Sequence, residues 1–110
     1  MNSENNNPLQ LDAEGHLQDH NDWSPKVAQT LADTLEVTLT DEHLHILEQV
    51  RGFHTQFNHP PATRPLIKYL QKQLPDADIS NQKLQRLFNT GLVAPHVNRL
   101  AGLPKPPNCL

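Results

Sequence analysis

The chain has 110 residues, a formal net charge of −3 at pH 7 and a single cysteine. This length suits one small domain and is too short for a deep cleft, while one cysteine excludes an intrachain disulfide and a cysteine-based zinc site. The negative charge disfavours broad contact with nucleic acid, which needs a basic face.

The start of the chain divides into two segments. Residues 1–7 are polar and rich in asparagine, without the basic and then apolar order of a signal peptide, so we expect a disordered terminus. Beyond them Leu9, Leu11 and Leu17 alternate around a glycine, which predicts a short β-hairpin. No apolar run approaches the roughly 20 residues of a membrane span, and we expect a protein of the reducing cytoplasm, where a free thiol persists.

The middle of the chain carries the strongest helix signals. Ser24 can cap a helix and Pro25 suits its first position, and the apolar stripe that follows extends this helix to about residue 36. Thr40 caps a second helix, whose first turn is acidic and whose apolar face is the widest in the chain. We expect this second helix to be the central core helix, with Gly52 at a close contact with another helix.

Three shorter helices follow. Thr63 is the expected cap of the third, Ser80 caps the fourth, and Pro95 opens a fifth that ends at Gly102. The chain is therefore predicted to be mainly α-helical, as a small bundle of about five helices with a short N-terminal β-hairpin. The expected divisions are a disordered segment 1–7, a helical domain 8–101 and a flexible C-terminal arm 102–110.

The sequence offers little that suits a metal or a cofactor. Seven histidines are present, but His43 and His45 point to different sides of a helix and the others are scattered. There is no HExxH motif, no glycine-rich phosphate loop and no acid/base pair with a supporting context. We therefore predict neither a bound metal nor a cofactor.

A DNA- or protein-binding regulatory module is one alternative, because the third and fourth helices could form a helix-turn-helix. Their basic residues are Arg64, Lys68, Lys72, Lys83 and Arg86. Charge scattered over solvent-facing helix surfaces is the commoner explanation, so direct contact with nucleic acid is not expected.

The C-terminal arm carries the residue with the most distinctive chemistry. Pro104, Pro106 and Pro107 favour an extended, polyproline-like arm, and Cys109 stands one residue from its end. At about 3.1 Å per residue, the arm can carry the sulfur roughly 25 Å from the end of the last helix. A lone cysteine is most often a small buried hydrophobe, but this position predicts a thiol that other molecules can reach.

The tail resembles the end of the DsrC/TusE sulfur-carrier family. The matching residues are 101–106, of sequence AGLPKP, and the penultimate Cys109. Similar blocks occur upstream in the same order: Asp22-Trp23, residues 39–43 (LTDEH), Arg51 with Phe53 and Phe57, and residues 61–68 (PATRPLIK). The similarity covers roughly residues 8–110.

This resemblance implies a small helical fold with an N-terminal hairpin and a function in sulfur relay. Cys109 is implied to accept a sulfane sulfur as a persulfide, which makes the chain a sulfurtransferase in the carrier sense without a self-contained active site. In the TusE branch the implied donor is a complex of TusBCD type. The implied recipient is a tRNA thiouridylase of MnmA type with its tRNA, and the product is 2-thiouridine at the wobble position.

In the DsrC branch the carrier serves dissimilatory sulfite reductase or another sulfur-metabolism partner. That branch uses a second cysteine eleven residues before the penultimate one, and this position is Asn98 here. The resemblance therefore favours the one-cysteine branch.

Four basic residues are candidates for partner binding. Arg64 and Lys68 lie one helical turn apart and share a face, while Arg99 precedes the arm and Lys105 lies on it. Solvated surface charge is the alternative explanation for each of them. The functional hypothesis is a basic rim that holds an acidic partner or steadies a charged sulfur adduct.

Overall fold

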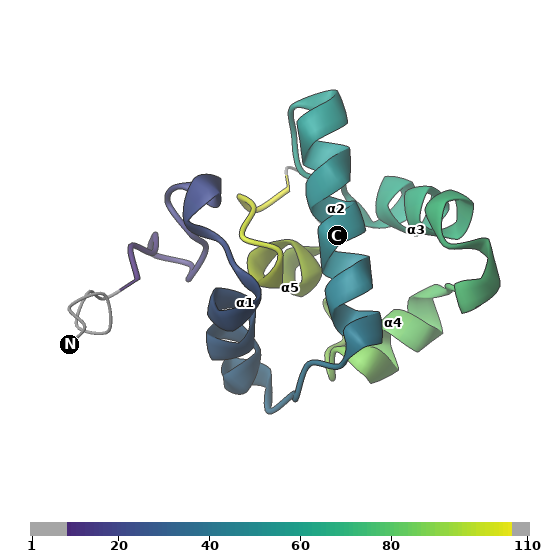
Figure 1. The fold of residues 1–110 in the computed structure, drawn as a ribbon, viewed down its shortest axis with the longest axis horizontal. Helices are drawn as coiled ribbons and strands as arrows, with labels where there is room; N and C mark the ends of the chain where they lie inside the picture. The colour runs from purple at the N-terminus through teal and green to yellow at the C-terminus, as the bar shows by residue number, and fades with distance from the viewer. Residues whose placement is uncertain (1–8, 107–110) are drawn as a thin grey trace.

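A computed structural model describes residues 9–106, and Figure 1 shows the path of the chain. The described residues form five α-helices: α1 (Pro25–Ala32), α2 (Asp41–Phe57), α3 (Thr63–Gln73), α4 (Asn81–Leu87) and α5 (Val93–Leu100). Short turns of 3₁₀ helix stand at His20–Asp22, Asp33–Leu35 and Pro75–Ala77. The mainly helical fold is confirmed. The predicted disordered segment 1–7 and Cys109 lie outside the described residues.

The starts of α1, α2 and α4 are capped as the sequence predicts. In each helix, the hydroxyl of the preceding residue accepts a hydrogen bond from the third backbone N–H of the helix. The pairs are Ser24 with Val27, Thr40 with His43, and Ser80 with Lys83. The predicted cap of α3 is wrong, because Thr63 is the first residue of that helix and the preceding Ala62 has no side chain that can accept a hydrogen bond.

The predicted N-terminal β-hairpin is also wrong. Residues 9–18, which we call the N-terminal loop, contain no strand and only an isolated antiparallel bridge between Leu11 and Leu17. One carboxylate oxygen of Asp12 accepts two backbone N–H groups further along the loop, at 2.8 and 3.0 Å, and curls the chain into a tight turn. His16 and Leu17 are both buried, whereas neighbours in a strand point to opposite faces.

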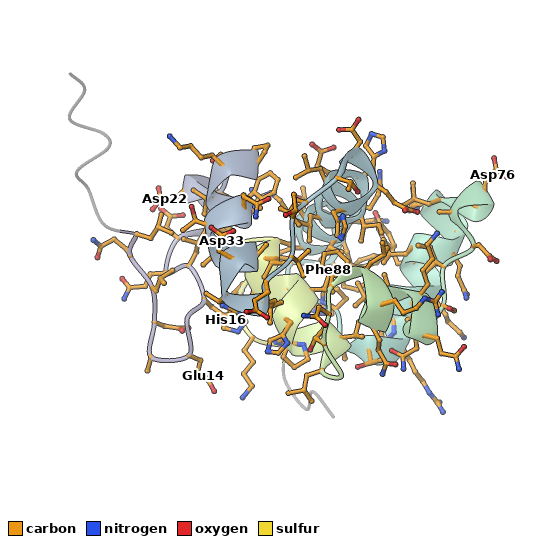
Figure 2. The ribbon with its side chains drawn as sticks, turned by 90° about the horizontal axis from the view of Figure 1, so that it is seen from below. Glu14, His16, Asp22, Asp33, Asp76 and Phe88 are labelled. Carbon is orange, nitrogen blue, oxygen red and sulfur yellow. The ribbon has the colours of Figure 1, made fainter. Side chains whose placement is uncertain are left out.

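The core is built around α5 rather than around α2. The last helix packs against α1, α2, α3 and α4, while α2 packs mainly against α3 and α5. Figure 1 shows α5 between α1 and α2. The inward residues of α5 are almost inaccessible, and they are Val93, Ala94, Val97 and Leu100. Phe88, just before this helix, is fully buried and lies in the middle of the molecule (Figure 2). The C-terminal arm therefore leaves from the centre of the fold.

The longest helix, α2, has 17 residues. Neither it nor any other helix within residues 9–106 is long and apolar enough to cross a membrane. As expected, Gly52 faces a neighbouring helix. A Cβ atom at this position would stand 3.5 Å from the hydroxyl oxygen of Tyr69 on α3, an ordinary van der Waals distance, so the packing of α3 does not itself require glycine here.

Candidate functional site

The C-terminal arm leaves α5 through a tight turn at Gly102. The φ angle of this glycine is +77°, in the left-handed region that glycine adopts without a steric penalty. The N–H of Gly102 donates to the carbonyl of Arg99 at 3.0 Å, and the N–H of Leu103 donates to that of Asn98 at 2.9 Å. These two bonds define a Schellman motif. We call residues 100–103 the arm root, and its turn fixes the direction in which the arm leaves the core.

Two side chains from distant segments bind carbonyl groups of the arm root. Nε1 of Trp23 donates to the carbonyl of Leu100 at 2.8 Å, and Nη1 of Arg51 donates to that of Ala101 at 2.9 Å. The guanidinium carbon of Arg51 lies 4.6 Å from the centroid of the Trp23 ring, a cation–π contact that joins the two side chains. Burial lowers the pKa of Arg51. The last carbonyls of a helix have no partner inside the helix, so these two bonds satisfy groups that would otherwise need water.

A third side chain reaches the arm root from the N-terminal loop. His16 is 3% exposed, and its Nδ1 lies 2.8 Å from the carbonyl oxygen of Leu103. A carbonyl only accepts hydrogen bonds, so Nδ1 of His16 carries the hydrogen. Figure 2 shows His16 on the side of the loop that faces the helices and Glu14 at its outer edge. We refer to His16, Trp23 and Arg51 as the arm-root residues.

The arm continues along the body beyond its root. Pro104 and Lys105 are exposed, whereas Pro106 is buried again. The ammonium group of Lys105 forms an ion pair with the carboxylate of Glu14 at 2.9 Å, which ties the arm to the N-terminal loop. The three steps from Pro106 to Cys109 span at most about 11 Å, much less than the reach counted from the end of α5.

The four basic candidates fall into two groups. Arg99 and Lys105 line one cavity beside the arm root. Arg64 and Lys68 are exposed on α3, one helical turn apart, and are not among the residues that line this cavity. The structure thus brings Arg99 and Lys105 together and leaves the other two on a separate helix.

Sequence reasoning gave no role to the arm-root residues. Trp23 and Arg51 stand in blocks that carry the family resemblance, whereas His16 is one of several histidines scattered along the sequence. The carbonyl bound by Trp23 lies 77 positions away along the chain, the one bound by Arg51 lies 50 away, and the one bound by His16 lies 87 away. No local sequence pattern predicts contacts over such separations. The only local signal in this region is Gly102, which marks where the last helix ends and the arm begins.

The buried His43 supports the fold rather than a metal. Its Nε2 lies 2.7 Å from the carbonyl oxygen of Leu87, and its Nδ1 accepts the backbone N–H of Thr40 at 3.0 Å. Both ring nitrogens are therefore engaged in contacts that hold α2 to the end of α4. Within the part of the chain that the structure describes, no three His, Cys, Asp or Glu side chains are grouped to hold a metal ion.

Comparisons with a family model, with curated sequences and with solved structures all point to the same family. Residues 3–110 match the model of the family described as DsrC like protein. The chain is 35% identical over 102 residues to the sulfurtransferase TusE of Photorhabdus laumondii, covering 93% of this chain and 91% of the relative. It is 33% identical over 102 residues to the sulfurtransferase TusE of Escherichia coli, with 93% of each chain covered.

Two solved structures share the fold. The NMR structure of Allochromatium vinosum DsrC has a TM-score of 0.79 and 37% identity, covering 91% of this chain and 88% of that one. The crystal structure of the oxidized gamma-subunit of the dissimilatory sulfite reductase (DsrC) from Archaeoglobus fulgidus has a TM-score of 0.72 and 31% identity, covering 93% and 92%. On this evidence of sequence and fold, the chain belongs to the DsrC family.

Proposed function

We propose that this chain is a sulfur carrier of the TusE type, which accepts a sulfane sulfur on Cys109 and passes it toward the 2-thiouridine of tRNA. The observation that carries the proposal is the family match over residues 3–110, a span that includes the single cysteine of the sequence. The curated relatives named sulfurtransferase TusE support a role in sulfur transfer.

The transfer needs no oxidant or reductant. The thiolate of Cys109 attacks the terminal sulfur of a donor persulfide, forms a new S–S bond and releases the donor as its thiolate. The donor S–S bond breaks in the same step, so the electron count is unchanged and Cys109 carries the persulfide. A recipient thiolate then attacks the terminal sulfur, and Cys109 returns as a thiolate.

Free Cys109 should be a weak nucleophile. The thiolate is the reactive form, and an ordinary cysteine is mostly the uncharged thiol at neutral pH. Lys105 on the arm favours a negative charge nearby, but it is already paired with Glu14. We expect activation only when a partner's electropositive pocket takes up the arm. Rapid alkylation of the isolated protein, at a rate independent of pH around neutrality, would contradict this expectation.

The arm root supports delivery of the thiol at a defined place. Because Pro106 packs on the body, Cys109 is confined to a short distance from it, and a partner must approach the surface around the arm to reach the sulfur. The arm-root residues hold the start of the arm in position before docking, which lowers the entropy cost of presenting it.

The second candidate is a carrier that serves a sulfite reductase. The Archaeoglobus relative is named as the gamma-subunit of a dissimilatory sulfite reductase. Asn98 disfavours the two-cysteine chemistry implied for that branch. Its side chain is fully buried, and Nδ2 donates to the carbonyls of Pro61 at 2.9 Å and Ala94 at 2.8 Å. The amide thus serves to hold the connection between α2 and α3 against α5.

Intact mass spectrometry tests the proposal. The wild-type chain and Cys109→Ser are incubated with a cysteine desulfurase, cysteine and donor proteins of TusBCD type, without reductant. We expect the wild type alone to gain the mass of one or more sulfur atoms. A gain on both proteins, or on neither when the donors are shown to be loaded, contradicts the carrier function of Cys109.

The recipient is tested separately, with the loaded carrier and a thiouridylase of MnmA type with its tRNA. Formation of 2-thiouridine with the wild type but not with Cys109→Ser supports the tRNA route. Loading of Cys109 without any transfer to this recipient would instead favour a sulfur carrier for another partner, such as a sulfite reductase.

A further inference from the structure

A small polar cavity lies where the N-terminal loop, α5 and the C-terminal arm meet. Its volume is about 220 Å³. The lining residues are Glu14 and His16 from the loop, Pro95, His96 and Arg99 from α5, and Lys105 from the arm. Every one of these except the proline carries a titratable side chain.

Arg99 is the principal charged group in this cavity. Its guanidinium is half-buried, and burial lowers its pKa. Nη2 donates to the hydroxyl of Thr34 at 2.9 Å, and among residues 9–106 no carboxylate forms an ion pair with it. The Arg99 side chain also packs beside Gly15, where a Cβ atom would stand 3.6 Å from its Cδ. The fold therefore holds a partly desolvated guanidinium against the cavity, and no carboxylate within residues 9–106 is paired with it.

The two histidines have fixed hydrogen-bonding directions. His16 uses Nδ1–H for the carbonyl of Leu103, which leaves Nε2 as its remaining polar atom. Nδ1 of His96 lies 2.5 Å from the hydroxyl oxygen of Thr90, so Nε2 is again the remaining atom. Burial lowers the pKa of His96, and the positive charge of Arg99 adds to this effect. Both factors disfavour a positive charge on His96 beside Arg99.

Glu14 is the acidic residue among the described residues that line the cavity, and its charge is already paired. Glu14 is exposed at the outer edge of the loop, and its carboxylate pairs with Lys105 at 2.9 Å. The remaining formal charge of the lining residues is that of Arg99. This charge excess would be relieved by a bound anion.

We propose that this cavity binds a small tetrahedral oxyanion of the class of inorganic phosphate or thiosulfate. The forked guanidinium of Arg99 matches two oxygens of such an ion, and the ammonium group of Lys105 adds a point charge. A volume of about 220 Å³ accommodates the ion with a few waters. The inference is independent of the chemistry proposed for Cys109.

Binding of an anion at this site would change the contacts of the C-terminal arm. Lys105 belongs to the arm, and His16 holds the carbonyl of Leu103 in the arm root. An oxyanion competes with Glu14 for the ammonium group of Lys105. Occupancy should therefore change the environment of the backbone N–H groups of residues 102–105.

The test is an NMR titration of the ¹⁵N-labelled full chain with sodium phosphate or sodium thiosulfate, with ionic strength kept constant by sodium chloride. We expect saturable shifts at the Gly15 N–H, the Arg99 side chain and the N–H groups of residues 102–105. Saturation with one salt alone identifies which of the two anions the site prefers. Shifts that rise without saturation in both, as they do in chloride, overturn the proposal.

Three variants make the assignment specific. Arg99→Gln should weaken binding by about tenfold or more, the loss expected when a charged hydrogen-bond donor is removed. Arg86→Gln on α4 is the matched control, since it removes the same charge from an exposed position away from the cavity, and it should leave the affinity unchanged. Equal effects of these two substitutions overturn the proposal.

Glu14→Gln keeps the proposal testable if Arg99→Gln is unstable. Glu14 is exposed, so its replacement should not affect folding, and it removes a carboxylate that pairs with Lys105. We expect tighter binding, by several-fold. An unchanged or weaker affinity in Glu14→Gln contradicts the site.

Discussion

The indole ring of Trp23 lies so close to Gly102 that a Cβ atom on residue 102 would stand 2.6 Å from Cδ1 of Trp23. Real Cβ atoms do not approach a ring atom this closely, so the contact exists only because residue 102 is glycine. The same glycine has a φ of +77°. Steric and conformational requirements therefore coincide at the point where the arm leaves α5.

Gly102→Ala should destabilise the chain by about 2 kcal/mol or more. A left-handed residue with a Cβ costs about 1–2 kcal/mol, and displacement of the Trp23 ring adds a penalty for overpacking. Urea-induced unfolding measures the change in the free energy of unfolding. Gly91→Ala is the matched control, because a Cβ at Gly91 meets nothing within 4 Å. A loss of similar size in both variants would contradict the role assigned to Gly102.

Trp23 and Arg51 should be energetically coupled. Trp23→Leu and Arg51→Met each leave a carbonyl of the arm root without its donor, and each should cost about 1–3 kcal/mol. Their cation–π contact should appear as a coupling energy of about 0.5–2 kcal/mol in a double-mutant cycle of unfolding free energies. Strictly additive effects would show that the two side chains act on the arm root separately.

The free energy of unfolding should fall as the pH drops below about 6.5, which is the ordinary pKa of a histidine side chain. Burial lowers the pKa of both His54 and His96 in the folded chain. The unfolded chain therefore binds more protons than the folded one just below this pH, so stability rises with pH there and is complete above it. Thermal unfolding between about pH 7.5 and 5 measures this slope.

The variants His54→Gln and His96→Gln separate the two contributions to that slope. Each should make the melting temperature less dependent on pH in the same window, and the double variant should flatten it further, because glutamine does not titrate. A slope that is the same in the double variant and in the wild type would assign the acid sensitivity to other groups.

Charge reversal on α3 should slow sulfur transfer if Arg64 and Lys68 hold a partner. Both side chains are exposed, so Arg64→Glu with Lys68→Glu should leave the melting temperature within a few degrees of the wild type. Exposed interface charges act mainly on the association rate, and we expect transfer from the donor to Cys109 to slow by about tenfold. The rate of mass gain at limiting donor concentration measures this effect.

The matched control pair is Lys26→Glu with Arg86→Glu, which makes the same change in net charge at exposed positions on α1 and α4. Transfer by this pair should remain close to the wild-type rate at moderate ionic strength. If both pairs slow transfer equally, the effect is one of net charge, and Arg64 and Lys68 are solvated surface residues.

Much of the fold could be predicted from short stretches of sequence. The starts of three helices could be predicted from their capping residues, because a cap accepts a hydrogen bond from a backbone N–H only three residues away. These residues are Ser24, Thr40 and Ser80. The local sequence pattern gave a wrong prediction where the backbone N–H groups had another hydrogen-bond acceptor close by. The carboxylate of Asp12 took up the N–H groups of its own turn, and the expected hairpin became a loop with a single bridge.

The sequence by itself determined the helices, the glycine that ends the last one and the position of Cys109 in the chain. Only the tertiary structure decided what surrounds the arm. His16 and Leu103 are 87 positions apart, and they meet because α5 packs at the centre of the bundle, which brings its carboxyl end to the N-terminal loop. Caps and stripes depend on neighbours within one or two helical turns, whereas these contacts depend on how all the helices pack together.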